Sequence, residues 1–182
     1  MGCNIHTQFQ KKTPDGWENI ETQYQEGRHY QLFAVLADAC NCYGVEGIHT
    51  GGRVQPIALP RYFPEDFGEV SKWLGDHTFS WLTGRELLEW YYSSLPLVKK
   101  TGIISVKEYG KWDKKSEPSV YYGQIFGDNI IVTEDPENDV VFTHVRVTWK
   151  EDLKKSLKYF FDEIQRLVEE HGEIRMVFGF DS

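Results

Sequence analysis

Residues 75–90, GDHTFSWLTGRELLEW, organise the rest of the chain, because a polar turn there runs directly into a helix whose start is chemically marked. Thr83 and Glu86 have the spacing of a capping box, in which the threonine hydroxyl accepts a hydrogen bond from the backbone N–H three residues on and the glutamate reaches back. Apolar residues at helical spacing follow, so packing holds this helix in place. The sequence therefore predicts a fixed polar turn, carrying Asp76 and His77, in front of a capped helix.

The N-terminal half contains strand, helix and loop patterns in turn. Residues 2–12 alternate apolar and polar side chains, and TPDG at 13–16 has turn chemistry, so a hairpin opens the fold. Residues 30–39 place apolar side chains at helical spacing. Residues 40–60 are rich in glycine and proline, which predicts a loop long enough to have a functional role. Residues 64–74 begin with Pro-Glu-Asp, which suits the first turn of a short helix.

The second half changes to strand patterns and then to one long helix. Residues 152–171 form a continuous apolar stripe at helical spacing, and Gly172 stands where a C-terminal cap belongs. Residues 173–182 alternate again, which predicts a final strand. Four segments before this helix have strand patterns, and a Gly-Asp turn joins the second to the third. They are residues 102–109, 119–126, 129–134 and 140–149.

These elements predict the fold class. Strands at both ends and in the middle, with helices between them, indicate an α+β fold with a mainly antiparallel sheet packed by three to four helices. With 182 residues, of which 40% are hydrophobic, the chain is large enough for one substantial core and small for two. We therefore expect a single globular domain over residues 1–182.

The net charge of -8 argues against one class of partner. A protein that wraps duplex nucleic acid needs many Lys and Arg side chains to replace counterions along the phosphates. A small phosphorylated ligand needs only a few local cations, so it stays compatible with that charge. The chain has no apolar run of membrane-spanning length and no apolar leader, so we expect no membrane partner and a cytoplasmic location.

Three cysteines, Cys3, Cys40 and Cys42, are too few for a disulfide framework and predict free thiols. Two interpretations stay open: buried or idle thiols, and a zinc site that Cys40 and Cys42 form with Cys3 or His6. A catalytic pair of Cys3 and His6 is disfavoured, because residues three apart on a strand point to opposite faces.

Five stretches, in the same order along the chain, resemble segments of one protein family. They are MGCNIH at 1–6, RHYQLFAVLAD at 28–38, PIALPRYFP at 56–64, GDHTFSWLTGRELL at 75–88 and MVFGFDS at 176–182. The family that they resemble is a set of uncharacterised tailed-bacteriophage proteins that open with MGCDIH and carry SWLT and RELL segments. The resemblance implies a phage or prophage origin and, by analogy of gene context, an accessory role against host defence.

The chain departs from that family's pattern at two places that matter for chemistry. Asn4 stands where the family has an aspartate, and an uncharged amide is a weaker metal ligand. The family's turn before SWLT usually carries two histidines, whereas only His77 stands here. The first departure weakens a metal role for Asn4.

The strongest set of chemical side chains comes from two strand ends and the turn, namely Asn4, His6, Asp76, His77 and Asp181. An amide and a histidine two apart on one strand face resemble the Asp-x-His start of binuclear metallophosphoesterases, although the other motifs of that fold are absent. A divalent metal held by His6 and His77 is one interpretation. Acid–base catalysis by the two histidines, assisted by Asp76 and Asp181, is another. The competing interpretation is that both histidines only bind backbone groups or solvent.

Candidate phosphate-binding residues come from the long loop and the segment after it. Thr50 and Arg53 flank two glycines, which permit close backbone approach, and the arginine offers a guanidinium fork. Arg61 would add positive charge. The P-loop lysine and its helix pattern are absent, so a plain loop is the alternative.

Two functional hypotheses follow. The first is a phage-encoded counter-defence enzyme, a hydrolase of a nucleotide or another phosphorylated small molecule. Its catalytic residues would be His6, His77, Asp76 and Asp181, and its ligand-binding residues would be Asn4, Thr50, Arg53 and Arg61. The second is a non-catalytic binding protein that sequesters a host signal molecule, or blocks a host defence protein through an aromatic, acidic surface.

Overall fold

The computed structural model describes residues 2–41, 54–68 and 72–182. These residues divide into two compact units, the first made of 2–41, 54–96 and 154–182 and the second of 97–153. The sheets are mainly antiparallel, and the described residues include four helices, so the predicted α+β class is confirmed. The single domain expected over the whole chain stays a prediction.

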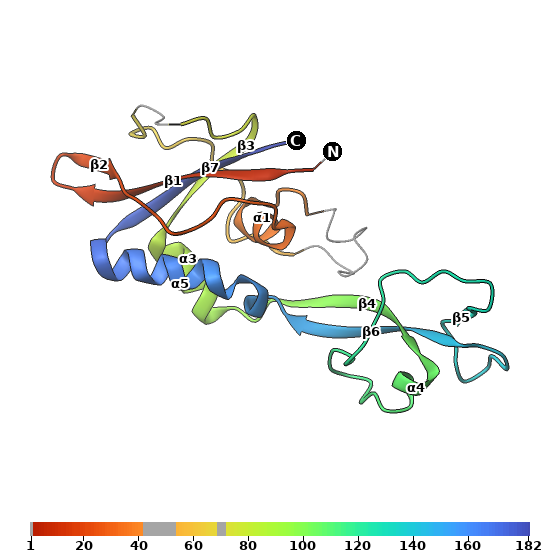
Figure 1. Ribbon diagram of the computed structural model, residues 1–182. Coiled ribbons are helices and arrows are strands. Elements are labelled where there is room, and N and C mark those ends of the chain that lie inside the picture. Colours follow the sequence, from red (N-terminus) through yellow and green to blue (C-terminus); the bar gives the residue numbers. More distant parts are fainter. Residues whose placement is uncertain (1, 42–53, 69–71) are drawn as a thin grey trace. The chain divides into compact units, whose positions relative to one another are not determined.

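The first unit is built on a four-stranded antiparallel sheet in the order β2-β1-β7-β3 (Figure 1). Its strands are β1 (Asn4–Thr13), β2 (Gly16–Asn19), β3 (His77–Thr83) and β7 (Ile174–Asp181). β1 and β2 form the predicted hairpin, with Gly16 at a φ of +135°, a conformation that favours glycine. The predicted final strand, β7, lies between β1 and β3, so Asn4 pairs with Asp181.

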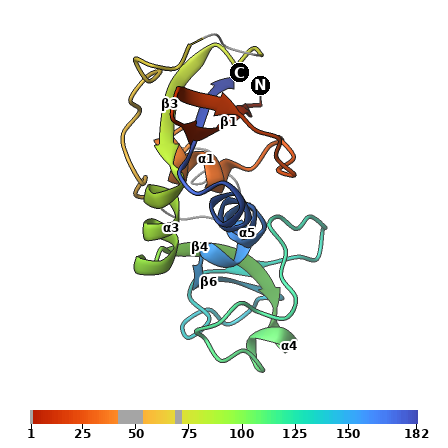
Figure 2. The same ribbon diagram turned by 90° about the vertical axis from the view of Figure 1, so that its left-hand side faces the viewer.

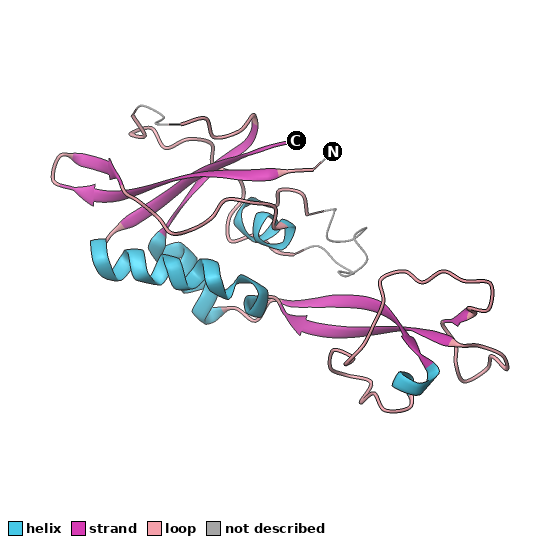
Figure 3. Cartoon of the chain, in the orientation of Figure 1, coloured by secondary structure: helices cyan, strands magenta, loops and turns pink. Residues whose placement is uncertain are grey.

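Three helices belong to this unit: α1 (Tyr30–Ala37), α3 (Gly84–Ser93) and α5 (Lys154–His171) (Figure 3). The predicted capping box starts α3, since the Thr83 hydroxyl accepts from the Glu86 N–H and the Glu86 carboxylate accepts from the Thr83 N–H. Gly172 ends α5 with a φ of +76°, as the sequence predicts. The apolar stripe of α5 is buried at Leu157, Phe160, Phe161, Ile164 and Leu167.

The two sides of this sheet are covered by different segments. On one side, Phe33 of α1 packs edge-on against Phe180, with 5.1 Å between ring centroids. On the other side, Phe67 and Leu74, which precede β3 in the chain, pack against Val177. α3 and α5 lie side by side (Figure 2). Both sides of β7 are therefore buried, and the strand serves as the centre of the unit.

The polar turn predicted around His77 is wrong, because residues 77–83 form strand β3. Ser80 is buried opposite Phe178 of β7. The side chains of this stretch therefore alternate between the two sides of the sheet, as they do in a strand. Thr78 alone in β3 has a left-handed φ, of +52°, and it lies at an irregularity between His77 and Ser80. The turn-like residues therefore mark a bulge within the strand.

The helix predicted over residues 64–74 is also wrong for the described part of that segment. Residues 64–68 form a turn and a short irregular stretch. Gly68 has a φ of +72°, which interrupts a right-handed helix. The carboxylate of Asp66, a residue whose type suits a helix start, binds the buried Arg175 instead.

The second unit is a three-stranded sheet in the order β4-β6-β5 with one short helix, α4 (Val106–Tyr109). β4 (Leu97–Ser105) and β6 (His144–Asp152) pair antiparallel along their full length. β5 (Val132–Thr133) pairs parallel with the start of β6. The buried core of this unit consists of Ile104, Val145, Val147 and Trp149.

Two of the four strands predicted in this unit are largely missing. In residues 119–126 only Tyr122 bridges to Ile103, and residues 129–134 contain only the two-residue β5. In the first segment Tyr121 packs against the core of the unit, but the alternation is not buried beyond it, since Phe126 is 84% exposed. The alternating pattern therefore predicted a strand where only one residue pairs with β4.

Candidate functional site

Three of the predicted site residues meet where β1 begins and β7 ends. Asp181 Oδ1 accepts hydrogen bonds from the Asn4 backbone N–H at 3.0 Å and from Asn4 Nδ2 at 2.9 Å. Asp181 Oδ2 lies 3.1 Å from His6 Nε2, and this hydrogen bond is the main cause that lowers the pKa of Asp181. The register places Asn4 opposite Asp181 and His6 opposite Gly179, so the three side chains project from one side of the sheet.

Glu26 and Trp73 complete the surroundings of His6. Glu26 Oε2 lies 3.8 Å from His6 Nδ1, and the centroids of the Trp73 and His6 rings are 4.7 Å apart. Burial by itself raises the pKa of Glu26, but hydrogen bonds from Lys72 and Thr7 outweigh it, so the pKa is lowered overall. The imidazole of His6 therefore lies between two carboxylates.

His77 lies on the opposite side of the sheet from His6. It pairs with Phe180 in the register of β3 and β7, and the centroids of the two rings are 6.2 Å apart. Its Nδ1 lies 2.8 Å from the Thr78 hydroxyl, and its Nε2 lies 4.0 Å from Asp76 Oδ1. The structure therefore does not bring the two histidines together. The described residues include no group of three His, Cys, Asp or Glu side chains placed to hold a metal ion.

The predicted phosphate-binding residues lie apart from this cluster or outside the described structure. Thr50 and Arg53 are outside the described residues. Arg61 Nη2 is bonded to Glu86 Oε1 at 2.5 Å, and its guanidinium lies 5.2 Å from the centroid of the Trp81 ring. Arg61 therefore ties the segment before β3 to the start of α3.

The Cys3 thiol is held in a neutral form by its surroundings. The residue is 3% exposed, and burial, followed by contact with Cys40, raises the pKa of the thiol to about 12. A thiol must ionise to act as a nucleophile or metal ligand, so this environment opposes both roles. Cys42, the third cysteine, lies outside the described residues.

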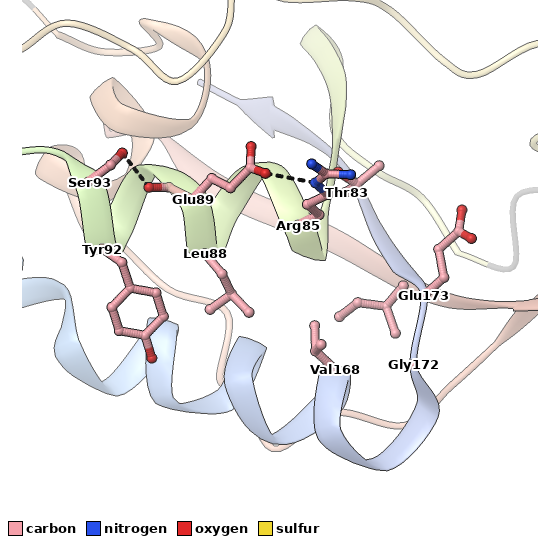
Figure 4. Close-up of a pocket in the computed structure, with 10 residues that line it drawn as sticks. Thr83, Arg85, Leu88, Glu89, Tyr92, Ser93, Val168, Gly172 and Glu173 are labelled. Atoms are coloured by element: carbon pink, nitrogen blue, oxygen red, sulfur yellow. Dashed lines mark hydrogen bonds and ion pairs between the residues drawn. The ribbon is translucent and has the colours of Figure 1, made fainter.

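A groove of about 1030 Å³ lies between α3 and α5 and was not predicted from the sequence (Figure 4). Leu88 and Tyr92 point from α3 toward α5, and Val168 of α5 and Ile174 at the start of β7 are further lining residues. Leu88 is half-buried, and Tyr92 is 68% exposed. The signal that could have found this groove is the i, i+4 spacing of Leu88 and Tyr92, one position beyond the buried Leu87.

The rim of the groove is acidic. Glu89 and Glu173 both line it. Arg85 also lines it, but its Nε donates to Glu89 Oε1 at 2.7 Å, and this hydrogen bond raises the pKa of Arg85. The Tyr92 hydroxyl donates to Gln165 Oε1 of α5 at 3.1 Å, so this side chain links α3 to α5. The groove therefore combines an apolar lining with a net negative edge.

Comparisons with protein families, with curated proteins and with solved structures found no match to this chain. The resemblance to phage proteins therefore stays a prediction. Among the helices of the described residues, none is long and apolar enough to cross a membrane. The strand-end cluster around His6 and the groove between α3 and α5 are the two features of the first unit that suggest a function.

Proposed function

We propose that this chain is a binding protein whose groove between α3 and α5 holds an amphipathic helix of a partner protein. The observation that carries the proposal is the apolar lining, in which Leu88, Tyr92, Val168 and Ile174 surround about 1030 Å³. Pockets for small molecules measure roughly 300–1,000 Å³, and an open groove between two helices suits an elongated apolar segment.

The charge of the rim favours a cationic occupant. The rim carries two carboxylates, Glu89 and Glu173, against one guanidinium, that of Arg85, which pairs with Glu89, and the whole chain has a net charge of -8. Basic side chains that flank an apolar stripe would meet these carboxylates, which speeds encounter and fixes orientation. If the chain is of phage origin, as its resemblance implies, the partner would be a defence protein in the host cytoplasm.

The experiment is binding of a synthetic helical peptide, with leucines along one side and lysines along the other, measured by fluorescence anisotropy. Leu88→Lys with Tyr92→Lys removes two lining side chains and adds positive charge. Affinity should fall by about tenfold or more, equivalent to about 1.4 kcal/mol. The matched control is Leu59→Lys with Tyr62→Lys, because these residues are 71% and 65% exposed and do not line the groove.

Two results would reject the groove as the binding site. The first is equal affinity of the peptide for the groove variant and the wild-type chain, or an equal loss in the control variant. The second is equal affinity for a peptide of the same composition in scrambled order, because attraction to lysine alone needs no apolar groove.

The surroundings of His6 favour a second function, hydrolysis of a nucleotide or another phosphorylated small molecule. With Asp181 bonded to Nε2 of His6, Nδ1 would accept a proton from an attacking water that enters beside Glu26, whose Oε2 lies 3.8 Å from Nδ1. A neighbouring cavity of about 330 Å³ is lined in part by Thr7 and Lys72, and a phosphate there would compete with Glu26 for the Lys72 ammonium group. A divalent metal at this site stays a prediction.

Incubation with a panel of cyclic and linear nucleotides, followed by mass spectrometry of the products, tests the second function. Loss of turnover in His6→Ala with full turnover in His77→Ala would support it, since His77 lies on the opposite side of the sheet. Turnover that survives in His6→Ala, or a panel that the wild-type chain leaves intact, would count against it.

A further inference from the structure

β4 and β6 of the second unit form a ribbon with one buried and one exposed side. Successive side chains of a strand alternate, and directly paired residues share a side. The buried side carries the core of the unit. The opposite side, here named the β4–β6 face, carries basic, polar and acidic side chains around one buried residue, Ile103. Its other members include Lys99 and Thr101 from β4 and His144, Arg146, Thr148, Lys150 and Asp152 from β6.

Two lysines of the β4–β6 face lie directly opposite each other. Lys99 pairs with Lys150 in the register, and both are exposed. Like charges at directly opposed positions destabilise an antiparallel pair. Within the described residues neither lysine has an ion pair, whereas Lys100, on the other side of the ribbon, binds Glu151. An anion between the two ammonium groups would remove their repulsion.

The other end of the β4–β6 face carries an arginine and an aromatic ring. Arg146 Nε lies 3.1 Å from Glu134 Oε1, but the Glu134 side chain is 79% exposed, so solvent screens this pair. Tyr122 bonds to Ile103 through both backbone groups at 2.8 Å and is 44% exposed. Because bridged residues share a side, Tyr122 lies on the β4–β6 face, 6.4 Å from His144 between ring centroids.

We propose that the β4–β6 face binds single-stranded nucleic acid, with phosphates on Lys99, Lys150 and Arg146 and a base stacked on Tyr122. Basic side chains beside an exposed aromatic ring hold single strands, since every base has a face that can stack. From Lys99 to Ile103 the strand rises about 13 Å, at about 3.3 Å per residue, which is the length of a few nucleotides. This site lies within the second unit and does not depend on the function proposed for the groove.

The experiment is fluorescence anisotropy of the full chain with labelled oligothymidylate and oligouridylate of about 15 nucleotides, and with a DNA duplex of the same length. At least one single strand should bind more tightly than the duplex. Three phosphate contacts predict a slope of about −2 for the logarithm of the association constant against the logarithm of salt concentration, because each contact contributes about −0.7. Duplex binding as tight as that of both single strands would overturn the proposal.

Charge reversal at the opposed lysines tests whether binding depends on this face or only on the net charge of the chain. Lys99→Glu with Lys150→Glu should weaken binding by about tenfold or more and make the salt slope shallower by about 1.4, the share of two contacts. Lys107→Glu with Lys111→Glu makes the same change in net charge at exposed lysines off the ribbon, and should leave affinity and slope unchanged. An equal loss in this control, or an unchanged slope in the first variant, would overturn the proposal.

Two further variants keep the test independent of folding and of charge. Lys99→Thr with Lys150→Thr should lose affinity as well, and threonine favours strands, so a folding defect cannot explain that loss. Tyr122→Ala should weaken binding by about tenfold without changing the salt slope, because a stacked base releases no counterion. Wild-type affinity in either variant would contradict the assignment of phosphates to the lysines or of a base to the tyrosine.

Discussion

Replacing Glu163 by glutamine should destabilise the first unit by about 2 kcal/mol at neutral pH. The Glu163 side chain, 9% exposed, accepts hydrogen bonds from the Thr22 hydroxyl at 2.9 Å and the Gln23 N–H at 2.7 Å. It also accepts two hydrogen bonds from Arg166, both at 2.8 Å. These contacts fasten the segment after β2 to α5, and a glutamine amide would point a donor at the arginine.

The magnitude follows from the pKa of this carboxyl group. The hydrogen bonds from Arg166 are the largest cause that lowers the pKa of Glu163 from 4.5 to about 2, which corresponds to about 3 kcal/mol. Arg166 is 37% exposed, so solvent screens part of the attraction and about 2 kcal/mol remains. Because the folded pKa lies below the unfolded one, the stabilisation is complete above about pH 4.5 and is lost as the pH falls toward about 2.

Urea unfolding followed by far-ultraviolet circular dichroism measures this effect, since α5 is an 18-residue helix. The free energies of unfolding of wild type and Glu163→Gln should differ at neutral pH. They should converge as the pH falls from about 4.5 toward about 2. Asp162→Asn is the matched control. Asp162 pairs with Lys158 on the same helix, and because the two side chains are 57% and 66% exposed, their ion pair contributes less than about 0.5 kcal/mol to stability. A difference between wild type and Glu163→Gln that persists in acid would refute the reasoning.

Two other predictions concern the same unit. Gly75→Ala should destabilise it by more than about 2 kcal/mol in thermal unfolding, because φ is +89° and a Cβ would lie 2.3 Å from the Phe180 carbonyl oxygen. Gly16→Ala is the control for backbone strain alone, because Gly16 has a φ of +135° and a Cβ there would have no atom within 4 Å. An equal loss of stability in both variants would contradict the clash. The Cys3 thiol, whose pKa burial raises to about 12, should react with a maleimide at neutral pH only as fast as the unit opens. Peptide mapping that finds Cys3 labelled rapidly in the native chain would contradict its burial.

Sequence signals that act within one helical turn predicted the structure well. The capping box of Thr83 and Glu86 joins groups three residues apart, and Gly172 ends α5 through its own backbone conformation. Neither feature depends on what the rest of the chain does. The strand pattern of residues 119–126 failed for the converse reason, since a strand needs a partner and only Tyr122 found one.

The candidate catalytic site could be predicted only in part, because the side of a sheet on which a residue lies depends on register. Asn4, His6 and Asp181 converge because β1 and β7 pair at their ends. His77 lies on the other side because β3 is paired so that it meets Phe180. A shift of one residue in that pairing would move the side chain across the sheet, and nothing in the local sequence fixes the shift.

Net charge and composition constrain the average surface, whereas binding depends on which residues the fold makes neighbours. Lys99 and Lys150 lie far apart in the sequence, and only the register of β4 and β6 sets them opposite each other. Leu88 and Val168 line one groove only because α3 packs beside α5. A chain with a net charge of -8 can therefore present an acidic rim suited to a basic helix and, separately, a pair of opposed lysines suited to phosphates. The class of partner is set by the local arrangement at each surface, so each needs its own charge-matched control.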